Sequence, residues 1–169
     1  MTPTTDLSDA NAGLVAHCRP IFRNFGARRH FNGPVATVSC LEDNVLYEQA
    51  LGDVSAGTVV VVDGGGSLGC ALMGDRLGGI AVDRGLPGVI INGCVRDTAE
   101  LAALDIAILA LAPHPRRSDK QGRGARDVPV SFAGVLWMPG HHVYGDPDGV
   151  VLSPHPLTDD RDPAAATAP

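Results

Sequence analysis

The residues best suited to chemistry lie in one stretch, Gly74 to Glu100, which reads GDRLGGIAVDRGLPGVIINGCVRDTAE. A Gly-Asp pair, Gly74-Asp75, opens a predicted helix, whose first backbone N–H groups have no intrahelical acceptor and can bind an anion. Arg96 offers a planar guanidinium for a carboxylate or carbonyl oxygen, and Asp97 offers a hard oxygen ligand for a cation. The stretch therefore predicts a site for a small carboxylate and a metal ion.

The order of the predicted elements indicates how these residues could meet. Asp75 starts a helix and Arg96 follows the next buried strand. A helix start and the end of a neighbouring parallel strand tend to meet at one edge of an α/β sheet, where ligands bind. The alternative is an ordinary βα unit in which Asp75 caps the helix and Arg96 forms a surface ion pair with Asp97.

The elements that must position these residues alternate between helix and strand, which is typical of an α/β fold. The pattern predicts a first helix that Thr4 or Thr5 caps, and the expected helices are 6–18, 42–51, 75–84 and 98–104. The expected strands are 34–40, 58–63, 88–92 and 106–112, and β-hairpins follow from Val128 onward. We expect a single domain over residues 1–156 and a disordered tail over 157–169.

Composition excludes several classes of function. The chain has 169 residues, is 44% hydrophobic and carries a formal charge of −6, so it can bury a core but offers no basic surface for direct contact with nucleic acid. The densest basic run, Arg116 to Arg126, is diluted by Ser, Asp and Gly, and it is either a solvated loop or an anion-binding lid.

The cysteines and the apolar segments indicate the compartment. Cysteines stand at positions 18, 40, 70 and 94 without CxxC spacing, which predicts reduced, buried thiols. No apolar run reaches the roughly 18 residues that cross a bilayer, and the first residues lack the pattern of a signal peptide. We therefore expect a cytoplasmic protein that does not interact with membranes.

Two further motifs have simpler structural explanations. The run Gly64 to Gly69, GGGSLG, matches the GxGxxG pattern of dinucleotide sites, but the next strand ends in Asn92 where such a site needs an acid for the ribose. We expect a tight turn beside the active site instead. His141-His142 could suggest a metal site, but adjacent strand residues point to opposite faces, so a structural hairpin is expected.

Together, several stretches resemble the RraA-like family, which includes the class II 4-hydroxy-4-methyl-2-oxoglutarate aldolases. They are VVVVDGGGSLGCALMGD, GVIINGCVRDTAELAALDIAILAL, HPRRSDKQGRGARDVPVSFAGV and YGDPDGVVL, and the likeness covers nearly everything from Pro20 to Leu152. Its sharpest element is an acid, twenty residues, Arg-Asp, two residues and another acid. The residues that match this element are Asp75, Arg96, Asp97 and Glu100.

The resemblance implies a fold, an assembly and an activity. The fold would be a single β/β/α, swivelling-domain-like α/β domain with a central mixed sheet or barrel flanked by helices, assembled as a homotrimer with sites at subunit borders. The activity would be that of a divalent-metal-dependent lyase that cleaves 4-hydroxy-4-methyl-2-oxoglutarate and related 4-hydroxy-2-oxo acids to pyruvate through a metal-stabilised enolate. Oxaloacetate decarboxylation would accompany this aldolase reaction.

The resemblance also implies a role for each matching residue. The backbone N–H groups from Gly74 to Leu77, which include those of Asp75 and Arg76, would bind the pyruvyl carboxylate of a small 2-oxo acid. Arg96 would hold the substrate oxygens and stabilise the enolate, and Asp97 would bind Mg²⁺ or Mn²⁺ directly. Asp75 would hold waters around the metal and act in catalysis, while Glu100 would orient the ligands from outside.

Two other functions belong to the same family resemblance. The first is a non-catalytic regulator that binds and inhibits ribonuclease E, but in that branch the residue after the arginine is not an acid, whereas this chain retains Asp97 and Glu100. The second is a menaquinone-biosynthesis methyltransferase, and the chain lacks a convincing site for a methyl donor. The residues favour the enzyme, with ribonuclease E as a further partner.

Overall fold

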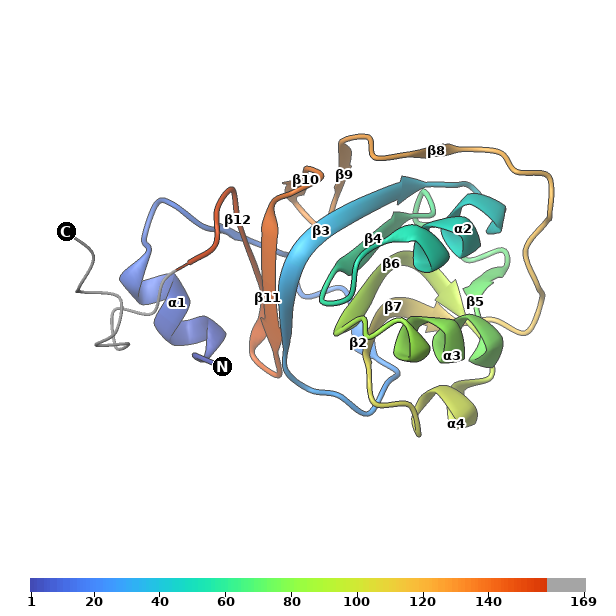
Figure 1. Ribbon diagram of the computed structural model, residues 1–169, viewed down its shortest axis with the longest axis horizontal. Helices are drawn as coiled ribbons and strands as arrows, with labels where there is room; N and C mark the ends of the chain where they lie inside the picture. Colours follow the sequence, from blue (N-terminus) through green and yellow to red (C-terminus); the bar gives the residue numbers. More distant parts are fainter. Residues whose placement is uncertain (158–169) are drawn as a thin grey trace.

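The computed structural model describes residues 1–157 and contains helices and strands that alternate along the chain (Figure 1). The helices are α1 (Thr4–Ala10), α2 (Val45–Asp53), α3 (Asp75–Asp83) and α4 (Thr98–Leu101). The strands are β1 (Ala16–His17), β2 (Arg23–Asn24), β3 (Phe31–Ser39), β4 (Val59–Asp63), β5 (Ala71–Met73), β6 (Gly88–Val95), β7 (Ala107–Pro113), β8 (Ala125–Arg126), β9 (Val130–Phe132), β10 (Val135–Trp137), β11 (His142–Asp146) and β12 (Gly149–Ser153).

Ten of these strands form one mixed sheet, in which β1, β12, β11, β3, β4, β6, β7 and β2 lie side by side in that order. Strands β3, β4, β6 and β7 are parallel, and the outer strands β11, β12 and β2 pair antiparallel. Strand β5 adds to the end of β6, while β9 and β10 form a separate hairpin. The predicted α/β fold with a central mixed sheet is confirmed, as a sheet rather than a barrel.

The central strands are apolar on both faces because each face packs against a different layer. Val60 and Val62 of β4 face a core that α2, α3 and α4 cover, whereas Val59 and Val61 face a second core. This second core contains the β9–β10 hairpin with Trp137, and parts of β11 and β12. Successive strand residues point to opposite faces, so a continuous run of four valines serves both cores.

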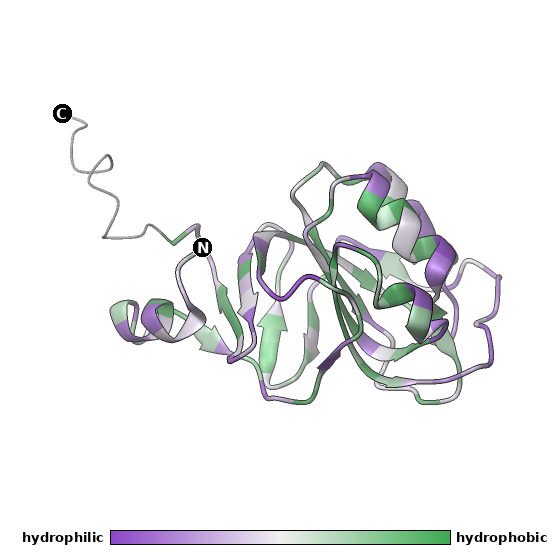
Figure 2. Cartoon of the chain, turned by 90° about the horizontal axis from the view of Figure 1, so that it is seen from below, coloured by the Kyte–Doolittle hydropathy of each residue, from purple (hydrophilic) through white to green (hydrophobic). Residues whose placement is uncertain are grey.

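Helix α3, which covers the sheet together with α2 and α4, is amphipathic. In Figure 1 α2, α3 and α4 lie together over β4, β6 and β7, while α1 lies at the opposite end of the molecule beside β12. Figure 2 shows both hydrophobic and hydrophilic residues on the covering helices and mostly hydrophobic ones on the strands beneath them. Leu77 and Ala81 of α3, four residues apart, are buried on its inner side.

The N-terminal helix differs from the prediction in length and capping. The expected helix over 6–18 ends at Ala10, because the chain turns through Gly13 at a φ of +81° and then forms β1. Neither threonine caps it: Pro3 is the N-cap residue, and the Thr4 hydroxyl lies 2.7 Å from Oδ1 of Asp146. Asp146, a distant residue on β11, therefore takes the place of the local N-cap hydrogen bond that the sequence predicted.

The other boundaries differ less. Helix 42–51 is observed as α2 at Val45–Asp53, strand 88–92 extends to Val95, and helix 98–104 ends at Leu101. Strand β5 was not predicted. Residues 158–169, most of the tail expected to be disordered, lie outside the described residues. Within residues 1–157, no helix is long and apolar enough to cross a membrane.

Candidate functional site

A pocket of about 180 Å³ opens where β5 and β6 end and α3 begins. Its wall consists of the predicted βα module together with parts of two other segments, one before α2 and one after β7. The lining residues are Asn44, Ala71, Leu72, Met73, Gly74, Asp75, Arg76, Leu77, Arg96, Asp97, Arg117, Ser118 and Lys120. The structure therefore brings together every predicted site residue except Glu100.

The end of β6 is shaped to present Arg96 and Asp97 to this pocket. A register shift against β7 lies between Ile91 and Cys94, and such bulges re-aim the residues that follow them. The Arg96 N–H donates to the carbonyl of Met73 at 2.9 Å, which ties the end of β6 to the end of β5. The bulge and this bond place the Arg-Asp pair beside the start of α3.

Asp97 has an unusual backbone conformation. Its φ of 56° and ψ of 44° lie in the left-handed region, which Asp and Asn tolerate better than most side chains. Its Oδ2 lies 3.3 Å from the backbone N–H of Asp75 and 3.3 Å from Nε of Arg96. The side chains of Arg96 and Asp97 are 41% and 32% exposed, so a ligand can reach both. Backbone strain that persists in a packed structure is typical of functional sites.

The start of α3 faces the pocket, and its predicted binding of an anion remains a prediction. Gly74 is the N-cap residue with extended backbone and has no side chain of its own to cap the helix, and the N–H of Asp75 donates to Oδ2 of Asp97. The N–H of Arg76 donates to Oδ1 of Asp75 at 2.7 Å, and the helix dipole favours further negative charge here. A Cβ on Gly74 would collide with Oδ2 of Asp97 and lie 3.2 Å from Cγ of Arg96. A glycine at this position therefore leaves room for the Arg-Asp pair.

Sequence reasoning missed a second group of charges at the pocket. Glu48 of α2 accepts two hydrogen bonds from the guanidinium of Arg76, at 2.6 and 2.7 Å, and lies 3.4 Å from Nζ of Lys120. The hydrogen bonds from Arg76 and the nearby positive charges lower the pKa of Glu48 to about 2. Glu48 and Arg76 are 28 positions apart in the chain, so no local motif signals this contact.

The basic run over 116–126 is part of the site. Arg117, Ser118 and Lys120 line the pocket, which supports the anion-binding alternative rather than a solvated loop alone. The segment is held by Asp43, whose side chain is fully buried and accepts backbone N–H groups of Gln121 at 2.7 Å and Arg123 at 3.3 Å. Burial raises the pKa of Asp43, but the backbone hydrogen bonds outweigh it and keep the pKa below its usual value.

Glu100 is placed apart from this pocket. It lies on α4, three residues after Asp97, and is exposed to solvent. It is not among the residues that line the pocket. Its predicted role as an orienting group remains a prediction.

The glycine-rich motif forms a turn. Gly65 and Gly66 have φ values of 67° and 69°, and Oδ1 of Asp63 accepts the N–H of Gly65 at 2.9 Å and Nδ2 of Asn92 at 2.8 Å. The turn leads into strand β5, whereas a dinucleotide site needs a helix whose N-terminus faces the phosphates. The predicted tight turn is confirmed, and neither a nucleotide site nor a methyl-donor site is supported.

The cysteines and histidines add no metal centre. All four cysteines are free, and Cys40, Cys70 and Cys94 are buried, as predicted, while Cys18 is only partly buried. Burial raises the pKa of Cys40 to about 12, so this thiol is unreactive near neutral pH. Within the described residues no group of three His, Cys, Asp or Glu side chains could hold a metal ion. His142 begins β11, which forms a hairpin with β12, and His141 directly precedes it, in agreement with the expected structural hairpin.

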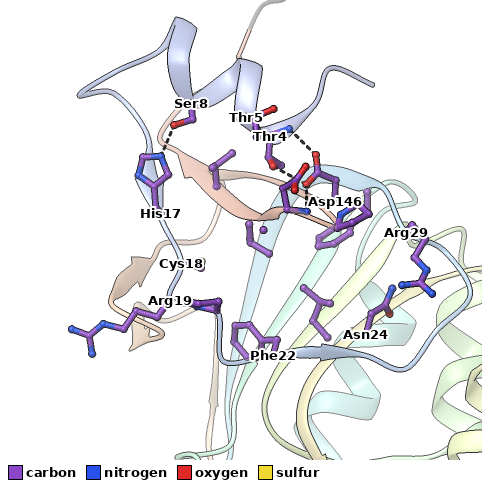
Figure 3. Close-up of a pocket in the computed structure, with 18 of the residues that line it drawn as sticks. Thr4, Thr5, Ser8, His17, Cys18, Arg19, Phe22, Asn24, Arg29 and Asp146 are labelled. Atoms are coloured by element: carbon purple, nitrogen blue, oxygen red, sulfur yellow. Dashed lines mark hydrogen bonds between the residues drawn. The ribbon is translucent and has the colours of Figure 1, made fainter.

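A larger cavity of about 670 Å³ lies at the other end of the molecule, between α1, β2 and the turn that joins β11 to β12 (Figure 3). Thr4 is hydrogen-bonded to Asp146 there, and Ser8 Oγ lies 2.7 Å from Nε2 of His17. None of the predicted site residues lines this cavity.

Comparison with known proteins gives the family. The model of the RraA-like family, described as Aldolase/RraA, matches residues 4–152. A Deinococcus radiodurans protein named "Putative 4-hydroxy-4-methyl-2-oxoglutarate aldolase" is 56% identical over 147 residues, which are 87% of this chain and 91% of that protein. The chain belongs to the RraA-like family.

Two solved structures share the fold closely. One, from Geobacillus kaustophilus, is described as an S-adenosylmethionine:2-dimethylmenaquinone methyltransferase; it is 50% identical, covers 92% of this chain and 97% of its own, and has a TM-score of 0.91. The other is described as the RNA-processing inhibitor RraA from Thermus thermophilis; it is 42% identical, covers 95% and 98%, and also has a TM-score of 0.91. The two names describe different functions although the fold is the same, so the fold alone does not determine the function.

Proposed function

We propose that this chain is a divalent-metal-dependent lyase that cleaves 4-hydroxy-4-methyl-2-oxoglutarate and related 4-hydroxy-2-oxo acids to pyruvate, and that also decarboxylates oxaloacetate. One observation carries the proposal: a single small pocket combines the N-terminus of α3, Arg96 and Asp97. Similarity to proteins named as aldolases supports the same reaction class. The pocket volume of about 180 Å³, room for about six waters, suits a short acid.

The residues present fit a hard divalent cation. Asp97 supplies a carboxylate at the pocket, and the missing Cβ of Gly74 leaves space beside it. Because no cluster of three ligating side chains exists within residues 1–157, zinc with its several protein ligands fits poorly. Mg²⁺ or Mn²⁺, which keeps several waters and binds one or two carboxylates, fits better. Asp97 would hold the cation directly, Asp75 would hold its waters, and Glu100 would orient them.

The reaction needs stabilisation of one charge. Cleavage of the C–C bond beside a 2-oxo acid leaves its electron pair on a pyruvate enolate, and a divalent cation supplies Lewis-acid stabilisation of that charge. The N–H groups from Gly74 to Leu77 would bind the carboxylate of the substrate, and those of Asp75 and Arg76 would exchange their present partners, the carboxylates of Asp97 and Asp75, for it. Arg96 donates to the oxygen on which the enolate charge develops. Asp75 accepts and returns the proton that moves during aldol cleavage.

The proposal is tested by measuring pyruvate release from oxaloacetate and from 4-hydroxy-4-methyl-2-oxoglutarate with Mg²⁺ or Mn²⁺. We expect release from both substrates, loss of release after EDTA treatment and recovery when metal is added back. No metal-dependent release from either substrate would refute the enzyme.

Asp97→Asn is the sharpest variant for this assay, because asparagine also tolerates the left-handed backbone but lacks the charge. We expect an unchanged melting temperature with at least about a hundredfold loss of kcat/KM, as for loss of a central electrostatic group. Asp83→Asn, an exposed acid at the other end of α3, is the matched control and should retain full activity.

We further propose that the chain forms a homotrimer, with the pocket at a border between subunits. The partly exposed Asp97 and the exposed Glu100 would then face a neighbouring copy. Light scattering should give about three times the chain mass of 17.5 kDa. A monomer at micromolar concentration would contradict this assembly.

A second candidate is a regulator of RNA processing, which the similarity to the Thermus structure favours. In this function the chain would bind ribonuclease E through its surface, and the pocket would not take part. A pull-down against a ribonuclease E scaffold segment tests this, with Asp97→Asn as the control that separates binding from catalysis. Absence of binding at micromolar concentrations would count against the regulator.

A further inference from the structure

Asn44 lies in the wall of the pocket with one polar atom uncommitted. The residue is only 7% exposed, and its Nδ2 donates to the carbonyl of Leu72, another wall residue, at 2.7 Å. Only the amino end of the amide can donate to a carbonyl, so this bond defines the orientation of the side chain. Its other end, Oδ1, is buried and has no hydrogen-bond partner within residues 1–157.

This acceptor stands out among the buried polar atoms of the described chain. Three other buried side-chain atoms there lack partners, on Trp137, His141 and His142, and none of these residues lines the pocket. An unpaired buried acceptor costs about 1–3 kcal/mol, so native structures usually supply a partner. At a ligand pocket, that partner can arrive with the ligand or with water.

The partner must be a hydrogen-bond donor or a cation, and the proposed function assigns the cation to Asp97, so a donor is needed at Asn44. Carboxylate and carbonyl oxygens of a 2-oxo acid only accept hydrogen bonds, so the 4-hydroxyl group and water remain. If the hydroxyl donated to Asn44, its proton would point away from any base, although aldol cleavage must remove that proton. A water that donates to Oδ1 keeps its lone pairs free to accept the proton.

We propose that Asn44 holds the water that takes the proton from the 4-hydroxyl group of the substrate, an inference that rests on the proposed function. The substrate O–H bond breaks, its proton passes to the water, and the water releases another proton to the carboxylate of Asp75, which lines the same pocket. The O–H electron pair forms the new C=O bond, and the pair of the broken C3–C4 bond moves onto the pyruvate enolate. Asp75 then returns the proton to C3, so no oxidant or other reactant is needed. Asn44 contacts the water and the carbonyl of Leu72 but not the reacting atoms, so it is a positioning residue.

The test compares two substrates that share the 2-oxo acid group but differ in the 4-hydroxyl group. Oxaloacetate lacks the 4-hydroxyl group, so its decarboxylation removes no hydroxyl proton, whereas aldol cleavage does. Asn44→Leu removes both polar ends, and we expect at least about a tenfold loss of kcat for aldol cleavage with unchanged KM, since a misplaced catalytic group costs on this order. The kcat of this variant for oxaloacetate decarboxylation should stay within about twofold of the wild-type kcat.

A second variant distinguishes the effect of losing the acceptor oxygen from the effect of losing the hydrogen bond to Leu72. Asn44→Asp loses that bond but keeps an acceptor oxygen, so it should recover most of the aldol rate. Equal losses in both reactions would show a merely structural role and overturn the inference. Unchanged aldol cleavage in Asn44→Leu would also overturn it.

A crystal structure of the wild type with pyruvate gives a readout that does not depend on activity. We expect an ordered water about 2.6–3.2 Å from Oδ1 of Asn44, and no water at this place in Asn44→Leu. An Oδ1 without water overturns the inference even if the enzyme is active. If the wild type releases pyruvate from neither substrate, the proposed function fails separately.

Discussion

Gly74, the N-cap residue of α3, and Gly79 within the helix show that an added methyl group has different effects inside and outside the site. A Cβ on Gly74 would collide with Oδ2 of Asp97, whereas a Cβ on Gly79 meets nothing within 4 Å. Both residues lie at the same helix, so they form a natural pair for mutagenesis.

We expect Gly74→Ala to displace Asp97 and to lower kcat/KM at least about tenfold, because small misplacements of catalytic groups are costly. Gly79→Ala should instead raise the free energy of unfolding by about 0.5–1 kcal/mol, since alanine is the better helix former. Urea denaturation and the pyruvate assay together check both expectations. A fully active Gly74→Ala would mean that the position of Asp97 is not critical.

At the scale of elements, the segment over 117–126 depends on one buried carboxylate. Asp43 accepts N–H groups from Val45 at the start of α2 and from Gln121 and Arg123 in the segment. Its removal leaves these backbone groups without partners, which is costly in a buried place.

We expect Asp43→Ala to lower the free energy of unfolding by about 1–3 kcal/mol and to release the segment locally. Limited digestion with trypsin should then cut after Lys120 and Arg123 faster than in the wild type. Asp53→Ala removes only an exposed ion pair with Arg126 at the end of the segment, which contributes little, so it is the control and should change cleavage little. Equal protection of the Asp43 variant would contradict the anchoring role.

The Glu48 contact between α2 and α3 predicts a dependence of stability on pH. The folded pKa of about 2 lies below the ordinary value of 4.5, so the carboxylate stabilises the fold above pH 4.5 and loses this contribution as pH falls toward 2. Exposure to solvent reduces the size of the effect. The melting temperatures of the wild type and Glu48→Gln should differ most near neutral pH and converge in acid. A constant difference across this range would exclude Glu48 as the titrating group.

The sequence predicted the parts of the site that are local and missed those that are not. Asp75, Arg96 and Asp97 belong to one βα module, and a helix start beside a parallel strand end has a known geometry. Glu48 contacts the pocket residues Arg76 and Lys120 from a distant part of the chain, and these contacts depend on packing that periodicity does not encode. The length of helix α1 was overestimated for a related reason, because the chain turns at Gly13 and then forms β1, whose Ala16 pairs with the distant Leu152 of β12. The order and type of the central elements followed from hydrophobic patterning, which tertiary packing reinforces.

For the whole molecule, the two hydrophobic cores share one sheet. The single tryptophan, Trp137, lies in the core with the β9–β10 hairpin, while α2, α3 and α4 cover the other core. Strands such as β4 contribute residues to both, so neither core can be lost alone without exposing the other.

We therefore expect tryptophan fluorescence and far-UV circular dichroism to report one coincident unfolding transition in urea. Two separate midpoints would show that the cores unfold independently and would contradict the single domain predicted for residues 1–156.

The anchoring of the 117–126 segment by Asp43 also has a calorimetric consequence. Because the backbone of this segment is already bonded to Asp43, a small acid that enters the pocket does not have to order it. Immobilising a loop on binding would consume about 1–2 kcal/mol of entropy for each residue. Titration calorimetry with pyruvate and Mg²⁺ should therefore show only a small heat-capacity change. Its size should not exceed the value expected from the surface that pyruvate itself buries, as for a preorganised binding site.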